Sequence, residues 1–142
     1  MAILNSASAH WTGTLKAGEG TITTRSGALS DLSYNQAKRF EGAAGTNPEE
    51  LIGAAHAACY AMFLSALMSG AGIDGIDVAA TSTVSMDPTT AGSPTVTAAH
   101  LTVVAKGATD AATIRDLAEK AKVGCPISKL LRAEVTMEVT VG

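Results

Sequence analysis

The segment "NPEELIGAAHAACYAMFLSALM", Asn47 to Met68, decides the fold class because it predicts one long helix. Asn47 is a favourable N-cap, Pro48 suits the first helical position, and Glu50 completes the pattern of a capping box. After Glu50 no formally charged residue follows until Asp74. A helix that is apolar on nearly all faces must be covered on nearly all faces, so we expect a buried, central helix.

The same stretch raises the alternative of a membrane span, because Leu51 to Ile73 is long enough to cross a bilayer. It is rich in Ala, Gly and Ser, contains His56, follows two glutamates and lacks a basic flank. The N-terminal "MAILNSASAHW" also lacks the basic n-region and the apolar run of a signal peptide. We therefore expect a soluble, cytoplasmic protein without a membrane partner.

Composition narrows the class of protein further. The length of 142 residues predicts a single domain over residues 1–142. The net charge of -3 offers no basic footprint for nucleic acid. Two cysteines far apart argue against a disulfide framework, and His56 is the only Cys or His at ligand spacing from either of them. We expect no metal and no cofactor.

Alternating, β-branched segments predict strands on both sides of the long helix. The turn "KAGEG" (16–20) joins the first pair, and "PTTAGS" (88–93) joins a second hairpin. A further short strand is expected after the first pair, and the chain closes on another strand. The predicted strands lie within residues 10–15, 19–25, 29–36, 76–87, 94–106 and 133–141.

Two more helical segments precede the closing strand. Residues 110–124 have helical periodicity, with Asp110 as the expected N-cap and Gly124 as the stop, and residues 125–131 predict a short helical piece. Strands, helix, strands, helix and strand together predict an α+β fold of antiparallel sheets around the long helix.

Cys59 occupies the middle of the long predicted helix. At about 100° per residue, Glu49 lies about 80° around the helix from Cys59, and Glu50 lies on the opposite side. The apolar stripe that contains or borders Cys59 is formed by Leu51, Ile52, Ala55, Met62, Phe63 and Ala66. Cys59 as a small core side chain, as most buried free cysteines are, therefore remains an alternative to a chemical role.

Cys125 stands in "VGCPISKL", directly before Pro126 in an expected first helical turn. Backbone N–H groups and the helix dipole at such a position stabilise a thiolate, although any small residue can precede such a turn. Cys59 and Cys125 are a candidate redox pair if the fold brings them together. His56, one helical turn before Cys59, leaves open a Cys–His hydrolase, but no third orienting group is evident.

The segments "RFEGAAGTNPEELIGAAHAACYAMFLSALM" and "AKVGCPISKLLRAEVTMEV" resemble the OsmC branch of the OsmC/Ohr family. The similarity covers essentially the whole chain, including "AHWTGTLKAGEGTITTRSG". It implies an OsmC-like fold, an intertwined homodimer, and a thiol-dependent peroxidase that acts in stress defence in the bacterial cytoplasm. It implies organic hydroperoxides as substrates, with hydrogen peroxide as a second candidate, and a dithiol or lipoylated protein as reductant.

The resemblance also implies roles for four residues. Cys59 matches the peroxidatic cysteine and Cys125 the resolving one. Arg39 in "KRFEG" matches the arginine that activates the thiolate, and Glu49 in "NPEE" the carboxylate that orients this arginine. The Ohr branch carries its arginine in the first hairpin turn, where this chain has "KAGEG", so the OsmC branch is favoured.

These residue types suit the implied chemistry. A thiol with a pKa near 8.5 is mostly protonated at neutral pH, and burial raises its pKa further. A buried peroxidatic cysteine therefore needs a cation that cannot deprotonate, and a carboxylate can hold the guanidinium in place. The alternative from a different class is a non-catalytic dimeric protein that binds a small hydrophobic ligand while its cysteines are merely buried.

Overall fold

The computed structural model describes residues 1–89 and 92–142, and these residues form two compact units. The first unit is Met1–Leu51 and the second is Ile52–Gly142. Each unit contains its own three-stranded sheet. The expected α+β class with two sheets and a long helix is confirmed.

The first unit is built on an antiparallel sheet of β1 (Ala7–Thr12), β2 (Glu19–Thr24) and β3 (Leu32–Tyr34), in that order. Both the hairpin and the short third strand were predicted. Glycine is required at position 18, in the turn between β1 and β2, because a Cβ there would lie 2.4 Å from the Thr14 carbonyl oxygen. The rings of Trp11 and Tyr34 lie against each other, with centroids 5.6 Å apart.

A short helix, α1 (Gln36–Phe40), follows β3 and was not predicted from the sequence. The Asn35 side chain caps it by accepting a hydrogen bond of 3.0 Å from the Lys38 backbone N–H. Five residues are too few for the periodicity that identifies longer helices. The element matters because it carries Arg39.

The long helix, α2 (Pro48–Gly70), begins where the sequence predicts. The Asn47 side chain accepts the Glu50 backbone N–H at 2.8 Å, as an N-cap does. The second hydrogen bond of the expected capping box, from the Asn47 backbone N–H to the Glu50 carboxylate, was predicted wrongly. The Glu50 carboxylate accepts from the Thr46 hydroxyl at 3.1 Å, because the largely buried Thr46 side chain requires an acceptor.

The second unit contains β4 (Asp77–Asp87), β5 (Thr95–Lys106) and β6 (Glu134–Val141), in that order across the sheet. The strands β4 and β5 form the predicted antiparallel hairpin, with a bulge at Ser85/Met86. Thr90 and Ala91 of the predicted "PTTAGS" connection lie outside the described residues.

The closing strand corrects the expectation of purely antiparallel sheets, because β6 runs parallel to β5. The connection between them contains two helices, α3 (Ala111–Gly124) and α4 (Pro126–Leu130). These helices bring the chain back to the end of the sheet where β5 begins, so that β6 runs in the same direction as β5. Parallel neighbours need such a crossover, whereas a tight turn produces an antiparallel pair. The N-cap predicted for α3 is confirmed, since Asp110 accepts the Thr113 N–H at 2.8 Å.

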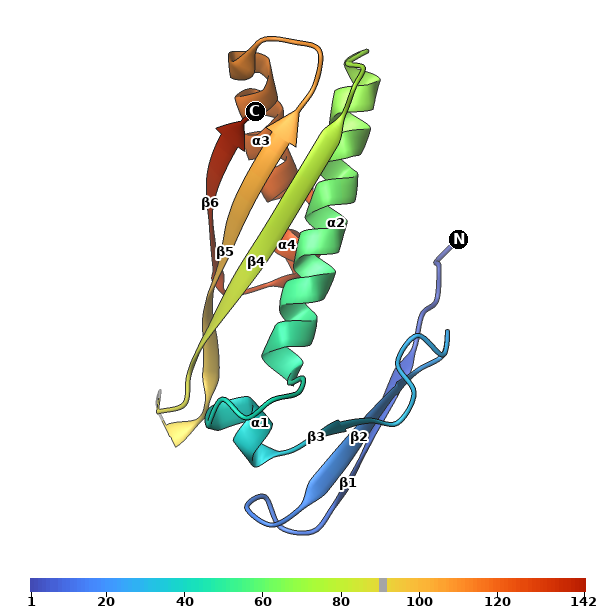
Figure 1. The fold of residues 1–142 in the computed structure, drawn as a ribbon, viewed down its shortest axis with the longest axis vertical. Coiled ribbons are helices and arrows are strands. Elements are labelled where there is room, and N and C mark those ends of the chain that lie inside the picture. The colour runs from blue at the N-terminus through green and yellow to red at the C-terminus, as the bar shows by residue number, and fades with distance from the viewer. Residues whose placement is uncertain (90–91) are drawn as a thin grey trace. The chain divides into compact units, whose positions relative to one another are not determined.

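The three helices of the second unit form one core with a single face of its sheet (Figure 1). The face is set by alternation along β5, where every second residue points inward. The fully or almost fully buried members come from α2, β5, α3 and the junction of α3 with α4: Tyr60, Leu64, Met68, Ala99, Leu101, Val103, Ala105, Ile114, Ala118, Ala121 and Cys125. This core fixes the middle of α2 against α3 and α4.

Only one face of α2 is buried within the chain, along a row at helical spacing: Gly53, His56, Tyr60, Leu64 and Met68. The predicted apolar stripe is therefore wrong as a buried face, because Ala55, Met62 and Ala66 are exposed, Met62 by 76%. By length and composition α2 could also cross a membrane, and 28% of that apolar window is buried in the chain. Burial of α2 on nearly all faces would require packing contacts that this chain alone does not make.

Candidate active site

Two thiols meet in the core of the second unit. Cys59 lies on α2, Cys125 lies between α3 and α4, and their Sγ atoms are 3.1 Å apart, with both cysteines reduced. Cys125 is held by the helix ends on either side, because its N–H donates to Ala121 and its carbonyl accepts from Lys129. Cys125 is completely buried, whereas Cys59 is half-buried.

The backbone N–H at the start of α4 interacts with the Cys59 thiol and not with Cys125, the cysteine that directly precedes α4. Burial raises the pKa of the Cys59 thiol, and its hydrogen bond with Cys125 raises it further. The Ile127 backbone N–H, in the first turn of α4, hydrogen-bonds Cys59 and opposes both effects by lowering its pKa. The sequence predicts a helix-terminal N–H for Cys125, but Cys125 is the N-cap residue, and its side chain makes no capping hydrogen bond.

His56 does not serve as a base for Cys59. The imidazole is fully buried, with Nδ1 2.8 Å from the Ser82 hydroxyl and Nε2 2.8 Å from the Ser128 hydroxyl. Burial lowers the pKa of His56, so the ring is neutral near pH 7. Both ring nitrogens are occupied by serines, which removes the observation that favoured a Cys–His hydrolase.

Arg39 and Glu49 form an ion pair within the first unit. Arg39 Nη2 donates to Glu49 Oε1 at 2.7 Å, and Arg39 Nε lies 3.2 Å from both carboxylate oxygens. The guanidinium also lies 5.2 Å from the centroid of the Phe40 ring. Glu49 is in the first turn of α2, where the helix terminus favours a negative charge. The carboxylate therefore fixes the orientation of the guanidinium fork.

A pocket of about 200 Å³ opens beside this ion pair in the first unit. Its walls are mainly aromatic and aliphatic, and one side of it is the Arg39 side chain. The lining residues are Trp11, Leu15, Tyr34, Asn35, Gln36, Arg39 and Phe40. Such a pocket offers apolar surface next to a fixed cation.

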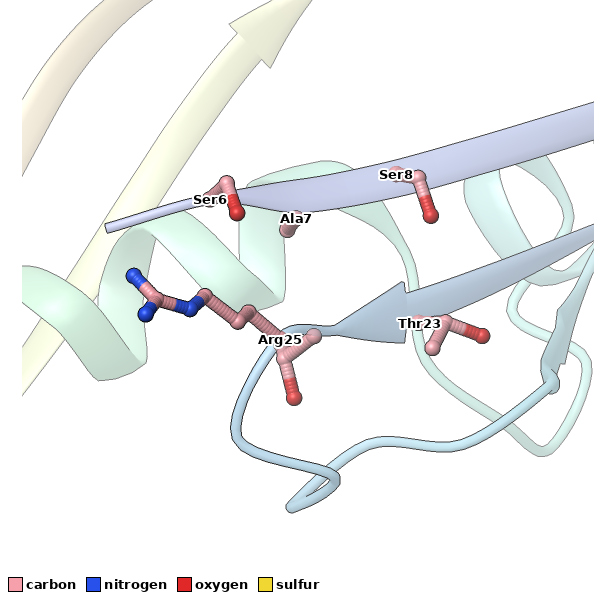
Figure 2. A pocket seen from close by; sticks show the side chains of 6 residues that line it. Ser6, Ala7, Ser8, Thr23 and Arg25 are labelled. Atoms are coloured by element: carbon pink, nitrogen blue, oxygen red, sulfur yellow. The ribbon is translucent and has the colours of Figure 1, made fainter. Parts of the chain in front are cut away.

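A second hollow, of about 350 Å³, lies over the β1–β2 hairpin and differs in chemistry (Figure 2). Ser8 on β1 is paired with Thr23 on β2, and Arg25 follows the end of β2. The hollow is open, and four of its six lining residues, Ser6, Ser8, Thr23 and Thr24, carry a hydroxyl group. None of the four predicted site residues lines it, so it is not part of the candidate active site.

The four predicted site residues thus form two pairs, Cys59 with Cys125 and Arg39 with Glu49, each inside its own unit. Within the described ranges, no group of three or more His, Cys, Asp or Glu side chains could hold a metal ion. The sequence did not reveal the Ile127 N–H or the two serines at His56. Pro126 marked the helix start that supplies the N–H, but nothing in the sequence indicated which sulfur receives it.

Solved structures place this fold among hydroperoxide-resistance and OsmC-like proteins. The chain superimposes with a TM-score of 0.71 on an organic hydroperoxide resistance protein from Elizabethkingia anophelis, at 26% identity over 100% of this chain and 99% of that one. The TM-score is 0.63 for the organic hydroperoxide resistance protein OhrB of Bacillus subtilis, at 25% identity over 96% and 98% of the two chains. An OsmC-like protein of Vibrio cholerae gives 0.72 at 15% identity, over 98% and 100%, which is a likeness of fold.

The sequence relatives are more specific. Residues 40–140 match the family of OsmC-like proteins. The chain is 45% identical over 138 residues to peroxiredoxin OsmC of Escherichia coli (strain K12), which covers 97% of this chain and 96% of that protein. The chain belongs to the OsmC family.

Proposed function

We propose that this protein reduces organic hydroperoxides, with Cys59 as the attacking thiol and Cys125 as the thiol that resolves the product. The protein is a cysteine-based peroxidase, in line with its 45% identity to a peroxiredoxin. The observation that carries the proposal is the separation of 3.1 Å between the two Sγ atoms, which places a second thiol in reach of the first.

The atoms that exchange bonds are these two sulfurs, the peroxide oxygens and the thiols of a dithiol. The Cys59 thiolate attacks one peroxide oxygen, the O–O bond breaks, and the alkoxide takes a proton and leaves as ROH. Cys59 is then a sulfenic acid, which condenses with the Cys125 thiol to a disulfide and releases water. An external dithiol reduces this disulfide by exchange, restores both thiols and becomes a disulfide itself.

The order of the two cysteines follows from their exposure. Cys125 is 0% exposed, so a peroxide cannot reach its sulfur without local opening. Cys59 is half-buried and receives the Ile127 N–H, which favours its thiolate. Cys59 is therefore the sulfur that meets the substrate.

The roles of Arg39 and Glu49 come from the family resemblance and belong to this proposal. Burial and the neighbouring thiol both raise the pKa of Cys59, so the reactive thiolate needs a further source of stabilisation. A guanidinium provides it, and can also stabilise the charge on the departing alkoxide. The ion pair between Arg39 and Glu49 supports this assignment, because a catalytic guanidinium must be held in a fixed orientation.

The pocket beside Arg39 favours organic substrates over hydrogen peroxide. Trp11, Leu15, Tyr34 and Phe40 provide apolar surface that an alkyl or aryl group can cover, which hydrogen peroxide cannot do. Burial of that group adds binding free energy in proportion to its apolar area.

A homodimer of this chain is also part of the proposal. Met62 is 76% exposed on a helix that carries no charge from Leu51 to Gly70, and a second copy of α2 would cover this face. We further infer that residues 1–142 act as one functional domain of a soluble, cytoplasmic dimer. A small dithiol or a lipoylated protein serves as its reductant.

The decisive experiment is turnover of cumene hydroperoxide with dithiothreitol in excess. Wild type should consume many equivalents of peroxide per chain, whereas Cys59→Ser should consume none above the background of the dithiol alone. Consumption of a single equivalent by the wild type, or equal turnover by Cys59→Ser, would refute the proposal. Consumption of a single equivalent would favour the alternative of a binding protein for a small hydrophobic ligand, whereas equal turnover by Cys59→Ser would place the chemistry on another residue.

A further inference from the structure

The buried His56 connects three elements of the second unit. It lies on α2 and hydrogen-bonds Ser82 on β4 through Nδ1 and Ser128 on α4 through Nε2, each at 2.8 Å. A neutral imidazole has one N–H donor and one acceptor nitrogen, and each hydroxyl can serve as either partner. Both polar atoms of the ring are therefore satisfied without water or charge.

The link to β4 has a second support in a close backbone contact, and the link to α4 lies next to the contacts of the two thiols. A Cβ on Gly53 would lie 2.8 Å from the Ser82 carbonyl oxygen, so α2 already touches the β4 backbone one turn before His56. By contrast, α4 has only five residues, of which Ser128 is the buried one and Leu130 is 72% exposed. Together with the contacts of Cys59 with Cys125 and Ile127, the bond to Ser128 ties α4 to α2.

The position of α4 matters for both thiols. The residue before Ser128 is Ile127, whose N–H bonds Cys59, and Cys125 directly precedes the helix. Formation of the disulfide shortens the Sγ–Sγ separation from 3.1 Å to about 2.05 Å, a movement of about 1 Å. A small shift of α4 therefore affects both contacts together.

We propose that His56 is a positioning residue that, through Ser128, holds α4 where the Ile127 N–H meets Cys59 and where Cys125 lies in reach of it. This role deepens the proposed function and rests on it. The step that it governs is the condensation of the Cys59 sulfenic acid with the Cys125 thiol, in which the S–S bond forms and water leaves. His56 itself touches neither the peroxide nor the sulfurs.

Two serine variants test the proposal with a matched control. Ser128→Ala and Ser82→Ala each remove one partner of the same imidazole, but only Ser128 lies on α4. We expect Ser128→Ala to move the alkylation of Cys59 by iodoacetamide to higher pH. We also expect it to slow disulfide formation by about tenfold, because misplacement of reacting groups by about 1 Å costs this much or more. Ser82→Ala should leave both quantities within about twofold of the wild type.

A second pair of variants covers a failure of either serine variant to fold. In His56→Gln the side-chain amide reaches the position of Nε2 and can still bond Ser128, whereas in His56→Asn it reaches only the position of Nδ1 and Ser82. We expect fast disulfide formation in His56→Gln and slow formation in His56→Asn, with both variants checked for folding by circular dichroism.

Equal effects of the two serine variants, with equal loss of stability, would reduce His56 to a general core residue and overturn the proposal. So would an unchanged Cys59 profile in Ser128→Ala, or equal rates in the Gln and Asn variants. Alkylation and diamide-induced disulfide formation need no peroxide. They therefore test His56 even if the wild type proves inactive as a peroxidase.

Discussion

The sulfur atoms of Cys59 and Cys125 lie 3.1 Å apart although 66 positions separate the two residues in the chain. The contact exists because α2 packs against α3 in the core, and Cys125 lies at the junction where α3 ends and α4 begins. The two thiols can therefore form a disulfide with a movement of about 1 Å and without unfolding.

Stoichiometric peroxide should convert both thiols into one intramolecular Cys59–Cys125 disulfide. In Cys125→Ser the sulfenic acid on Cys59 has no partner, so it should persist and then over-oxidise to sulfinic acid. Mass spectrometry of the intact chain and of its peptides measures both outcomes. Oxidation confined to Cys125, with Cys59 untouched, would reverse the assigned roles.

Replacement of Cys125 should also change the acidity of Cys59. Burial raises the pKa of Cys59 most, and the hydrogen bond with Cys125 raises it further. In Cys125→Ala the pKa of Cys59 should therefore fall, and at a fixed pH below it the thiolate fraction and the alkylation rate should rise. The pH dependence of iodoacetamide labelling gives the midpoint. A midpoint that stays in place or moves upward would contradict this account of the pair.

Arg39→Lys keeps a positive charge but loses the planar fork that Glu49 holds. We expect peroxide reduction to slow by about tenfold to a hundredfold, the equivalent of one charge-assisted hydrogen bond. Stopped-flow measurement of peroxide consumption gives the rate, and circular dichroism checks the fold. The matched control is Arg132→Lys, an exposed arginine outside the site, which should keep full activity. Full activity in Arg39→Lys would remove Arg39 from the mechanism.

Two glycines of α2 should respond to alanine with opposite signs. A Cβ at Gly53 would lie 2.8 Å from the Ser82 carbonyl oxygen, so Gly53→Ala should destabilise the fold by about 1–3 kcal/mol. Gly70 has no neighbour within 4 Å of such a Cβ, so Gly70→Ala should be neutral or stabilising by up to about 1 kcal/mol. Urea unfolding at equal protein concentration measures both. Equal stability of the two variants would mean that α2 and β4 are not in close contact at Gly53.

Glu49 and Cys59 are ten residues apart on one helix, which corresponds to about 15 Å at a rise of 1.5 Å per residue. We therefore expect the two to act together across the proposed dimer, so that each site takes residues from both chains. Mixing Cys59→Ser chains with Glu49→Ala chains should then restore activity above either parent, because one site of the heterodimer regains both residues. Since Glu49 holds Arg39 in the same chain, Arg39→Ala chains should complement in the same way. Verified heterodimers without recovered activity would place Glu49 and Cys59 in one chain's site.

The sequence predicted the elements whose signals are local. The long helix, its Asn47 cap, both hairpins and the Asp110 cap all follow from side chains within a few residues of one another. The parallel pairing of β6 with β5 could not be predicted from such local signals. The direction of β6 depends on the end of the sheet to which α3 and α4 carry the chain. The five-residue α1 was missed because it is shorter than the window in which periodicity can be recognised.

For the candidate site, the sequence and the family resemblance predicted which residues take part. The contacts between these residues could be known only from the structure. The meeting of Cys59 with Cys125 and the bond from Ile127 both join segments more than 60 residues apart. The apolar face predicted from the helical spacing of residues on α2 was also wrong. The buried row contains His56 and Tyr60, whereas Met62 is exposed. Apolar periodicity cannot tell a face that meets the chain's own sheet from one that meets another molecule.

The unequal burial of the two thiols determines how the oxidised protein is regenerated. In a disulfide between them, the sulfur of Cys125 is enclosed by the core, and only the sulfur of Cys59 has an open side. An incoming dithiol must therefore attack Cys59 along the line of the S–S bond, with Cys125 as the leaving group. The transient mixed disulfide thus forms on α2, and the shape of the surface around Cys59 selects the electron donor as well as the peroxide.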